Sequence, residues 1–370
     1  MTRRLALFTE VPAPFRFPLF AELGGRQGIR LRVLFLAARD PRRPYPGDLS
    51  GARFDATVLP GHALQRGGRW IIVSRRVVTS LAQLRPQVVI VGGWNQPAFW
   101  QALLWARLTR SALVVWVEST ERDARSGGGL LERAKRTMIE RATAFLVPGT
   151  ASRHYLQSLG VDPSRIFTAP NAVDRALFRD RVNEHRHDIA ALRAELGLTR
   201  ATILSVCRLD PEKGVDLLLE AVDGLAADLV IAGAGVNADA LAAVAPSGVR
   251  FLGAVPPADL ARWYAASDIF VLASRSEQWG MVINEAAEAA LPIVTTDAVG
   301  AAADLVVDGE SGFVVPAGDA SALRAALQRL VDDPPLRARA GLRSRALVDP
   351  FTPAAWADGV EALVAEVNGC

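Results

Sequence analysis

Short apolar segments alternate with helical segments along the whole of this 370-residue chain, and this alternation constrains the fold more than any other feature. The apolar segments are rich in Val, Ile and Leu, which is typical of strands that are covered on both faces. Strands that alternate with helices indicate a parallel sheet with helices on both sides. The predicted strands are 5–9, 31–37, 88–91, 113–117 and 144–147 in the first half, and 202–206, 228–231, 250–252, 269–272, 293–296 and 312–315 in the second.

The alternation is interrupted once, after the fifth predicted strand, at 169–174 and in the polar stretch 180–188. A chain of this length fits two domains of ~100 to 200 residues each. We therefore expect an α/β protein with two doubly wound parallel sheets, divided near residue 175. Ligands of open parallel sheets bind beyond the carboxyl ends of the strands, so two such domains that face each other would hold a ligand between them.

Several classes of protein are disfavoured by the sequence. No apolar stretch reaches the ~18 residues of a membrane-spanning helix. The first apolar stretch meets Glu10 and Pro12 too early for a secretion signal, and we expect a cytoplasmic protein. The two cysteines, Cys207 and Cys370, lack the paired spacing of a zinc or redox site, so no structural metal is expected. No Gly-x-Gly-x-x-Gly motif opens the first helix, which argues against a dinucleotide-dependent dehydrogenase.

Charge is distributed unevenly between the two halves of the chain. Residues 1–175 hold 26 basic and 12 acidic side chains, whereas residues 176–370 hold 16 and 27. A basic half favours an anionic partner. We expect a phosphate-bearing ligand or an anionic membrane surface, and no nucleic acid.

The basic residues of the first half form three clusters. The second cluster surrounds the apolar run from Trp70 to Val78, a mixture that predicts an amphipathic helix at the surface of a membrane. An ordinary helix with a solvated arginine face explains the same pattern. The first interpretation predicts a protein bound peripherally to the inner face of a membrane. The clusters are Arg39, Arg42 and Arg43; Arg66, Arg69, Arg75 and Arg76; and Arg133, Lys135, Arg136 and Arg141.

The strongest local motif is the segment 276–285, which follows a predicted strand and opens a helix. Gly280 lets the backbone approach a ligand, and the amides of Met281 and Val282 point out of the helix start, where the helix dipole favours an anion. Glu285 lies roughly 6 Å further along the helix axis, where its carboxylate can accept hydrogen bonds from two hydroxyl groups. We interpret the segment as a seat for phosphates with a ribose beside it. An ordinary turn followed by a solvated helix face is the alternative.

A second motif, at 207–214, follows another predicted strand and contains the one lysine of the second half. Arg208 and Lys213 lie five residues apart across a turn, close enough to converge on one polyanion. Two fixed cations can stabilise the negative charge that develops on a diphosphate leaving group without a metal ion. Two surface cations on a turn are the common alternative. A third loop, which begins at Gly233, adds a weaker glycine signal.

These motifs, taken in order, resemble the retaining, nucleotide-sugar-dependent glycosyltransferases of the GT-B fold, in particular family 4. The resemblance is specific in the second half of the chain and looser in the first. The matching segments of the second half are 208–214, 232–235, 251–255, 264–274, the pair Glu277 and Glu285, and 308–315; those of the first half are 11–16, 92–96, 147–150 and 170–174.

The resemblance implies an arrangement of domains. An acceptor-binding domain would occupy 1–175 and a nucleotide-sugar-binding domain 176–350, both Rossmann-like and facing each other. The segment 351–370 would form a helix that crosses back onto the first domain.

The resemblance also implies roles for particular residues. Arg208 and Lys213 would bind the diphosphate of the donor, and Glu285 would hold its ribose. Glu277 would lie by the donor sugar, and the backbone around Val255 would meet the base.

This chain departs from the family pattern at three positions. Many relatives have a histidine after the fourth strand of the first domain, where this chain has either Glu118 or Ser119, with Glu118 the more reactive candidate. A carboxylate there can stabilise a positive charge on the anomeric carbon or attack it. The alternative, which we favour, is that Glu118 binds a hydroxyl group of the sugar or acceptor. Cys207 replaces a glycine, and Asp304 replaces a glutamate.

We expect a retaining glycosyltransferase that moves a sugar from a nucleoside diphosphate to an acceptor hydroxyl of a glycan, a lipid-linked sugar or a small molecule. No cofactor and no metal are expected, because Arg208 and Lys213 supply the positive charge. Two alternatives stay open. One is a nucleotide-sugar epimerase on the same fold, which would consume donor without an acceptor. The other is a non-catalytic protein that binds nucleotide sugars.

Overall fold

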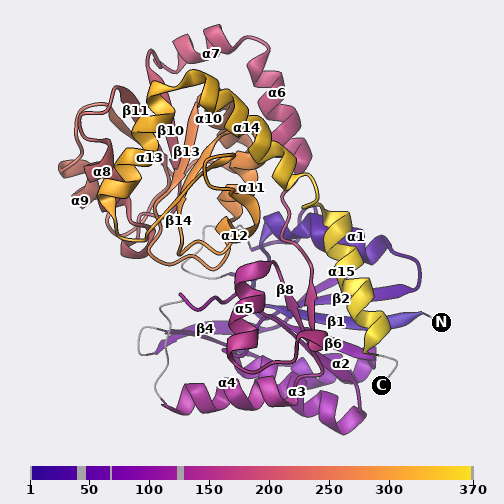
Figure 1. The fold of residues 1–370 in the computed structure, drawn as a ribbon. Coiled ribbons are helices and arrows are strands. Elements are labelled where there is room, and N and C mark those ends of the chain that lie inside the picture. Colours follow the sequence, from indigo (N-terminus) through magenta and orange to yellow (C-terminus); the bar gives the residue numbers. More distant parts are fainter. Residues whose placement is uncertain (1, 40–46, 67–68, 123–128, 368–370) are drawn as a thin grey trace.

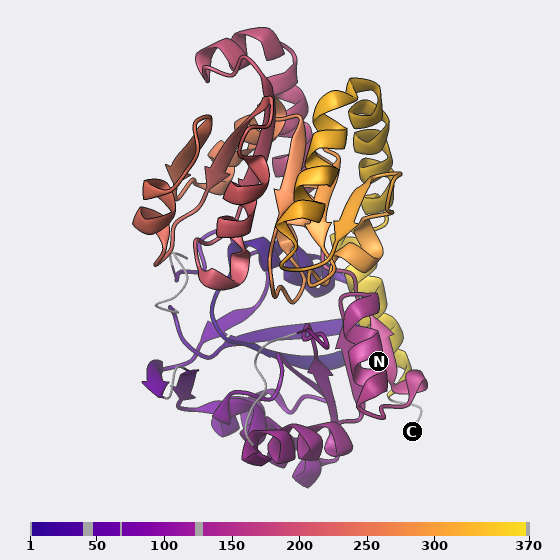
Figure 2. The ribbon, with the colours of Figure 1, turned by 60° about the vertical axis from the view of Figure 1, so that its left-hand side comes forward.

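The computed structural model describes residues 2–39, 47–66, 69–122 and 129–367. Within these residues a sheet of seven parallel strands has the order β3-β2-β1-β6-β7-β8-β9, and a sheet of six parallel strands has the order β12-β11-β10-β13-β14-β15. Figures 1 and 2 show the two sheets one above the other, each with helices on both faces. The predicted fold class, two doubly wound parallel sheets, is confirmed.

The first sheet is buried on both faces. Along β1, Leu5 and Leu7 pack on the face that α1 covers, while Ala6 and Phe8 pack on the face covered by α2, α3, α4 and α5. The strands are β1 (Arg3–Thr9), β2 (Ile29–Phe35), β3 (Ala56–Val58), β6 (Val88–Val91), β7 (Ala112–Trp116), β8 (Ala144–Val147) and β9 (Ile166–Thr168). The helices are α1 (Phe17–Gly25), α2 (Val77–Leu84), α3 (Pro97–Thr109), α4 (Gly129–Arg141) and α5 (Thr150–Ser158), with short turns η1 (Pro14–Arg16) and η2 (Pro163–Arg165).

The second sheet is built in the same way, with α8, α9 and α13 on one face and α10 and α11 on the other. The strands are β10 (Ala201–Val206), β11 (Ala227–Ala232), β12 (Val249–Gly253), β13 (Ile269–Leu272), β14 (Ile293–Thr296) and β15 (Gly312–Val315). The helices are α7 (Ile189–Glu195), η4 (Pro211–Lys213), α8 (Val215–Val222), α9 (Ala238–Ala243), α10 (Pro257–Ala266), α11 (Met281–Glu288), α12 (Ala302–Leu305), α13 (Ala320–Asp332) and α14 (Pro334–Val348).

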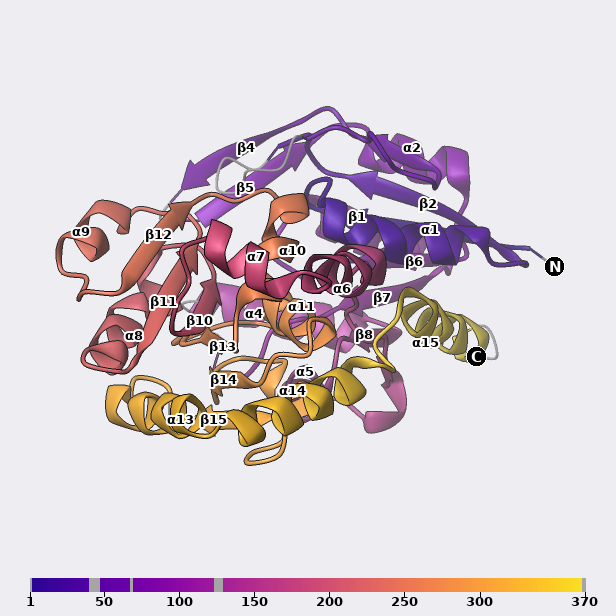
Figure 3. The same ribbon diagram turned by 90° about the horizontal axis from the view of Figure 1, so that it is seen from above.

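The predicted amphipathic helix around residues 66–78 is wrong. The segment forms an antiparallel hairpin of β4 (Gly61–Arg66) and β5 (Arg69–Ser74), and a helix begins only at Val77. Ile72 is buried and Val73 exposed, because successive side chains of a strand point to opposite faces. The aromatic and β-branched residues of this run favour a strand. Figure 3 shows the hairpin at one margin of the molecule. Arg42 and Arg43, of the first basic cluster, lie outside the described residues.

The polar stretch 180–188, which interrupts the apolar pattern of the sequence, is largely helical. A π-helix, η3 (Ala176–Asp180), leads into it, and α6 (Arg181–Arg186) lies within it. Val182 is fully buried against the second domain, and α6 contacts α10.

The chain crosses between the two domains twice. In the first crossing, Ala172 packs in the core of the first domain and the next residue, Val173, packs in the core of the second. In the second crossing, Val348 belongs to the second core and Trp356 to the first. Trp356 lies on α15 (Pro353–Glu366), which packs on α1 and β9 beside the first sheet (Figures 1 and 3).

A buried carboxylate joins the two crossings to α11. Glu288, at the last turn of α11, is fully buried. It accepts from Nε of Arg175 at 2.8 Å and forms an ion pair with Arg179, whose Nε lies 2.6 Å from Oε2 of Glu288. Arg179 also contacts Asp349 of the second crossing at 2.8 Å. A buried carboxylate needs such partners, and removing them would leave an uncompensated charge.

Candidate active site

An ion pair at the carboxyl edge of the second sheet joins the two motifs predicted from the sequence. Lys213 follows β10 in η4, and Glu277 follows β13. The Lys213 ammonium donates to Oε2 of Glu277, and only 8% of the lysine side chain is exposed. The structure therefore brings together two residues that are 64 positions apart in the sequence.

The start of α11 lies beside this ion pair. Gly280 has a φ of +91°, a conformation that favours glycine, and a Cβ there would lie 3.2 Å from Cγ of Glu277. As the first residues of α11, Met281 and Val282 have backbone N–H groups without a partner inside the helix. Lys213 and the helix start thus lie at the same edge of the sheet, as an anion site requires.

Glu285 lies one turn further along α11 and contacts a buried tyrosine. The hydroxyl of Tyr264, on α10, donates to Oε2 of Glu285 at 2.8 Å. Burial raises the pKa of Glu285 to about 7, and the Tyr264 hydrogen bond opposes that shift. A carboxylate in this state gains from any further hydroxyl that donates to it, as the hydroxyls of a ribose would.

Arg208 lies at the same edge but points along its own loop. Its guanidinium pairs with Asp210 and with Glu212, the latter at 2.5 Å, and about half of the side chain is exposed. Burial raises the pKa of the Cys207 thiol to about 11, and the charges of Arg208, Lys213 and Glu277 all act on it. These three charged groups therefore surround the end of β10.

The glycine loop and Val255 lie next to each other at this edge. A Cβ on Gly233 would lie 1.7 Å from the carbonyl oxygen of Cys207, so only glycine fits there. The amide of Gly233 donates to the carbonyl of Gly253 at 2.7 Å, which brings the loop after β12, with half-buried Val255, beside it.

Arg275 was not singled out from the sequence, yet it connects the two motifs. Its guanidinium makes two hydrogen bonds of 2.7 Å to Asp216 and one of 3.0 Å to the carbonyl of Pro211. The Arg275 hydrogen bond holds the pKa of Asp216 below its usual value. In a sequence this rich in arginine, an arginine that follows a strand does not by itself indicate a functional residue, so Arg275 could not be predicted.

The carboxyl edge of the first sheet presents Glu118, directly after β7. Arg16 of η1 donates to Oε2 of Glu118 at 2.8 Å, and Asn171 donates to Oε1 at 3.1 Å. The Arg16 guanidinium also lies 4.6 Å from the ring centre of Trp116. Arg16 and Asn171 lie in segments that resembled the family, but nothing in the sequence showed that they meet at Glu118.

The two edges face each other, and several contacts cross between the domains. Gln278 donates to Oγ of Ser119 at 3.4 Å, beside Glu118. Oγ1 of Thr150, at the start of α5, donates to Asp304 of the second domain at 2.7 Å. Burial raises the pKa of Asp304, and the Thr150 hydrogen bonds oppose that shift. Asp304 thus has a role in the contact between domains.

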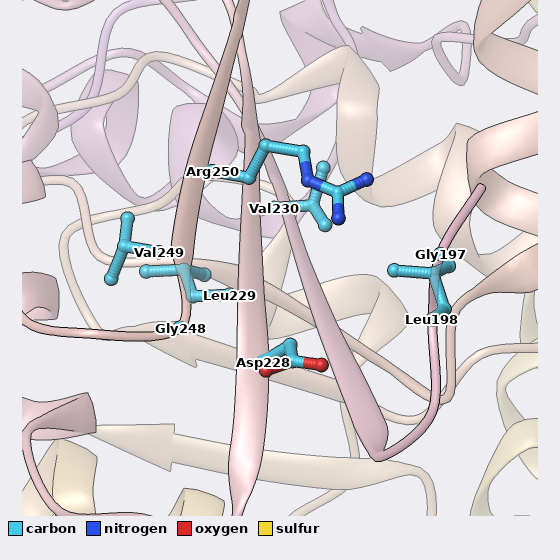
Figure 4. Close-up of a pocket in the computed structure, with 8 residues that line it drawn as sticks. All are labelled: Gly197, Leu198, Asp228, Leu229, Val230, Gly248, Val249 and Arg250. Atoms are coloured by element: carbon cyan, nitrogen blue, oxygen red, sulfur yellow. The ribbon is translucent and has the colours of Figure 1, made fainter.

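Two cavities elsewhere do not coincide with this site. Figure 4 shows the first, of about 220 Å³, which is lined by Asp228, Gly248 and Arg250 at the amino-terminal ends of β11 and β12. The second, of about 530 Å³, lies between α4 and the end of α5.

Among the described residues no group of three His, Cys, Asp or Glu side chains is placed to hold a metal ion. No helix in the described ranges is long and apolar enough to span a membrane.

Comparison with known proteins agrees with this geometry. The family model described as "Glycosyl transferases group 1" matches residues 188–364, and the model described as "Glycosyl transferase 4-like domain" matches residues 18–172. The first covers the second sheet with Lys213 and Glu277, and the second covers Glu118 and every strand of the first sheet except β1.

Two curated relatives illustrate the sequence similarity. D-inositol 3-phosphate glycosyltransferase of Thermomonospora curvata is 34% identical over 218 residues, which are 52% of this chain and 50% of that protein. Glycogen synthase of Mycobacterium tuberculosis is 28% identical over 336 residues, 86% of this chain and 75% of that protein. The match spans about half the length of the inositol phosphate glycosyltransferases.

Solved structures share the fold. HepE of Anabaena, in complex with UDP and glucose, has a TM-score of 0.78 at 18% identity, over 98% of this chain and 100% of that one. Sucrose-phosphate synthase of Thermosynechococcus elongatus has a TM-score of 0.77 at 19% identity, with all of both chains covered.

Proposed function

Because the chain belongs to the group 1 glycosyl transferases and has the GT-B fold, we propose that it transfers a sugar from a nucleoside diphosphate to an acceptor hydroxyl with retention of anomeric configuration. One observation carries the proposal: Lys213, Glu277 and the start of α11 lie together at the edge of the second sheet that faces Glu118. A cation and a helix start suit a diphosphate. Relatives with UDP bound support the donor class.

The second domain binds the donor in this proposal. The diphosphate is bound by Lys213, by Arg208 and by the backbone amides of Met281 and Val282. Glu285 accepts from the ribose, and the loops at Gly233 and Val255 meet the base. Glu277 pairs with Lys213 through Oε2, and its Oε1 can accept a hydrogen bond from a hydroxyl of the sugar.

The reaction depends on stabilising the negative charge that develops on the leaving group. As the bond between the anomeric carbon and the diphosphate breaks, negative charge grows on the diphosphate oxygen next to Lys213. The acceptor hydroxyl attacks from the same face and passes its proton to that oxygen, so every proton is accounted for without a protein base. We propose that the lysine replaces a metal ion here, and we expect transfer to continue in EDTA.

Glu118 serves to bind a hydroxyl group in this scheme. Arg16 donates to one oxygen of the Glu118 carboxylate and Asn171 to the other. These hydrogen bonds fix the position of the carboxylate and make it a weaker nucleophile. Each oxygen keeps a further lone pair for a hydroxyl of the donor sugar or the acceptor. The acceptor then enters from the first domain.

A ligand screen tests the proposal. Thermal shift is measured with UDP, GDP, ADP and their sugars, because a ligand that binds the native state raises its melting temperature. The best donor is then incubated with and without acceptors, and the anomer of the product is read by proton NMR. Donor consumption without an acceptor would indicate an epimerase, and binding without turnover would indicate a non-catalytic protein.

We also propose that the acceptor is lipid-linked and that the first domain docks on an anionic membrane. The predicted helix at 66–78 does not exist, but α3 exposes Leu104 and Leu108 (60% and 76%) on either side of Arg107. Helix α4 adds exposed Arg133 and Arg136, and both helices lie at the base of the first domain in Figures 1 and 2. Apolar side chains among arginines suit an anionic headgroup layer.

Vesicle flotation checks the docking. We expect recovery with anionic vesicles that falls at high salt, and a clear loss in the double variant Leu104→Ser/Leu108→Ser. Leu342→Ser, at an equally exposed leucine of the second domain, is the matched control. Equal recovery from neutral vesicles without a salt effect would reject docking.

A further inference from the structure

Two buried asparagines connect α11, the helix proposed to bind the sugar donor, to the first domain. Asn284, in the middle of α11, is fully buried, and Asn171, in the first crossing between domains, is 3% exposed. Oδ1 of Asn284 accepts from Nε1 of Trp279 at 2.8 Å, and its Nδ2 donates to the backbone carbonyl of Asn171 at 2.9 Å. An indole only donates and a carbonyl only accepts, so the partners fix the orientation of this amide.

The Asn171 side chain continues the connection to Glu118. Its Nδ2 donates to Oε1 of Glu118 at 3.1 Å, while Arg16 holds Oε2 of the same carboxylate at 2.8 Å. An ionised carboxylate only accepts, so this amide is oriented by its partner as well. A single residue, Asn171, thus separates Glu118 from the donor helix.

The stripe of α11 assigned to the donor lies next to the stripe that carries Asn284. Met281 and Glu285 are four residues apart on the stripe proposed to meet phosphate and ribose, whereas Asn284 and Glu288 are four residues apart on the stripe bonded to the first crossing. Helix α11, which is proposed to bind the donor, therefore also bonds the first crossing, and Asn171 of that crossing bonds Glu118.

We infer that Asn171 is a positioning residue for sugar transfer, which sets the Glu118 carboxylate relative to the donor helix. The inference rests on the proposed function, in which Glu118 binds a hydroxyl of sugar or acceptor. Two anchors, one on each oxygen, define the plane of the carboxylate. With only Arg16 left, the carboxylate can rotate about its side-chain bonds and lose its alignment with a donor on α11.

A double-mutant cycle on Asn171 and Glu118 tests the inference. Asn171→Ala keeps the backbone carbonyl that Asn284 binds and removes only the amide that holds Glu118. We expect Asn171→Ala to lower kcat about fivefold while the affinity for UDP changes less than twofold. In the Glu118→Gln background the same change should lower kcat less than twofold. Equal fold losses in both backgrounds would overturn the inference, because a merely structural role does not depend on Glu118.

A matched cycle controls for general loss of an amide and carboxylate pair. Gln328 donates to Asp332 at 2.8 Å on the exposed face of α13. Gln328→Ala and Asp332→Asn, singly and together, should leave kcat unchanged.

Asn171→Asp keeps the test valid if the alanine variant does not fold. Its carboxylate would face that of Glu118, so kcat should fall more than in Asn171→Ala. Combined with Glu118→Gln, the new carboxylate can accept from the glutamine amide, and kcat should equal that of Glu118→Gln alone. A further loss in the combined variant would contradict the inference.

A crystal structure of Asn171→Ala with UDP separates this inference from the proposed function. We expect a displaced Glu118 carboxylate and an unmoved α11. An unmoved carboxylate overturns the inference even when transfer is observed. Absence of transfer in the wild-type protein, with a displaced carboxylate in the variant, would overturn the proposed function and support the positioning by Asn171.

Discussion

The carboxyl edges of the two sheets are assembled in different ways. At the second sheet, the charged groups come from two short motifs of one domain, and Lys213 pairs with Glu277 within it. At the first sheet, Glu118 is held by Arg16 and Asn171, which lie 102 and 53 residues away in the sequence. The second edge is therefore complete within one domain, whereas the first depends on a segment that crosses between domains.

This difference separates two kinds of kinetic effect. Substitutions at the second edge should weaken donor binding and leaving-group stabilisation. Substitutions at the first edge should lower turnover with donor affinity preserved. The four predictions that follow test this division.

The largest effect is expected for Lys213→Ala, with kcat/KM lower by about 100-fold, or ~2.7 kcal/mol. The lysine is nearly buried beside the proposed leaving group, so water screens its charge little. Steady-state kinetics with the identified donor measure the loss. Lys135→Ala removes the other lysine of the chain, which pairs with Glu132 at 2.6 Å, and should have no effect on transfer to a water-soluble acceptor. Wild-type turnover in Lys213→Ala would retire the diphosphate role.

Arg208→Ala should cost somewhat more than tenfold in kcat/KM, or ~1.4 kcal/mol. The effect is smaller because Arg208 is half exposed and shares its charge with Asp210 and Glu212. Arg200→Ala is the matched control, since Arg200 is equally exposed and pairs with Asp228 at 2.5 Å. Equal losses in both variants would show that the assay reports general stability.

Donor affinity should rise about tenfold between pH 6 and pH 8 through Glu285. Its pKa of about 7 in the free protein means that hydroxyl donors must first displace a proton, which becomes easier as pH rises. Calorimetry with UDP-glucose measures the affinity, and Glu285→Gln should make it independent of pH. Because the folded state binds this proton more tightly than the unfolded state, the free energy of unfolding without ligand should fall as pH rises from the ordinary pKa of 4.5 to about 7 and level off above that. A flat affinity profile in the wild type would contradict the ribose role.

Glu118→Gln should lower kcat about fivefold, or ~1 kcal/mol, because a neutral amide binds a hydroxyl less strongly than a carboxylate. Affinity for UDP and folding should stay unchanged, since Glu118 lies on the first domain and the nucleotide is proposed to bind the second. Glu22→Gln, at a carboxylate that pairs with Arg26 at 3.1 Å on α1, is the control. Unchanged kinetics in Glu118→Gln would show that the replacement of the family histidine is incidental.

The second edge was largely predictable because its residues lie within continuous motifs. Each motif follows a strand, and the ends of neighbouring parallel strands meet at one edge, so Lys213 and Gly280 had to come close. Tyr264 was not predicted as a partner of Glu285, because nothing in a sequence shows which side chains of α10 and α11 touch. The hairpin at 61–74 was misread, since apolar residues among arginines suit a helix and a strand alike.

The sequence by itself determined the two parallel sheets, the loops that carry charge and the residue types able to grip a diphosphate, because these follow from local periodicity and from strand ends. Only the tertiary structure decided what surrounds Glu118 and how α11 is attached to the first domain. Asn171 and Asn284 both lie in segments that stand out in the sequence, but nothing in either segment shows that the two residues, 113 positions apart, meet; their contact depends on the packing of both domains. Hydrogen-bond partners of this kind are fixed by the relative placement of whole elements, which short-range sequence patterns do not encode.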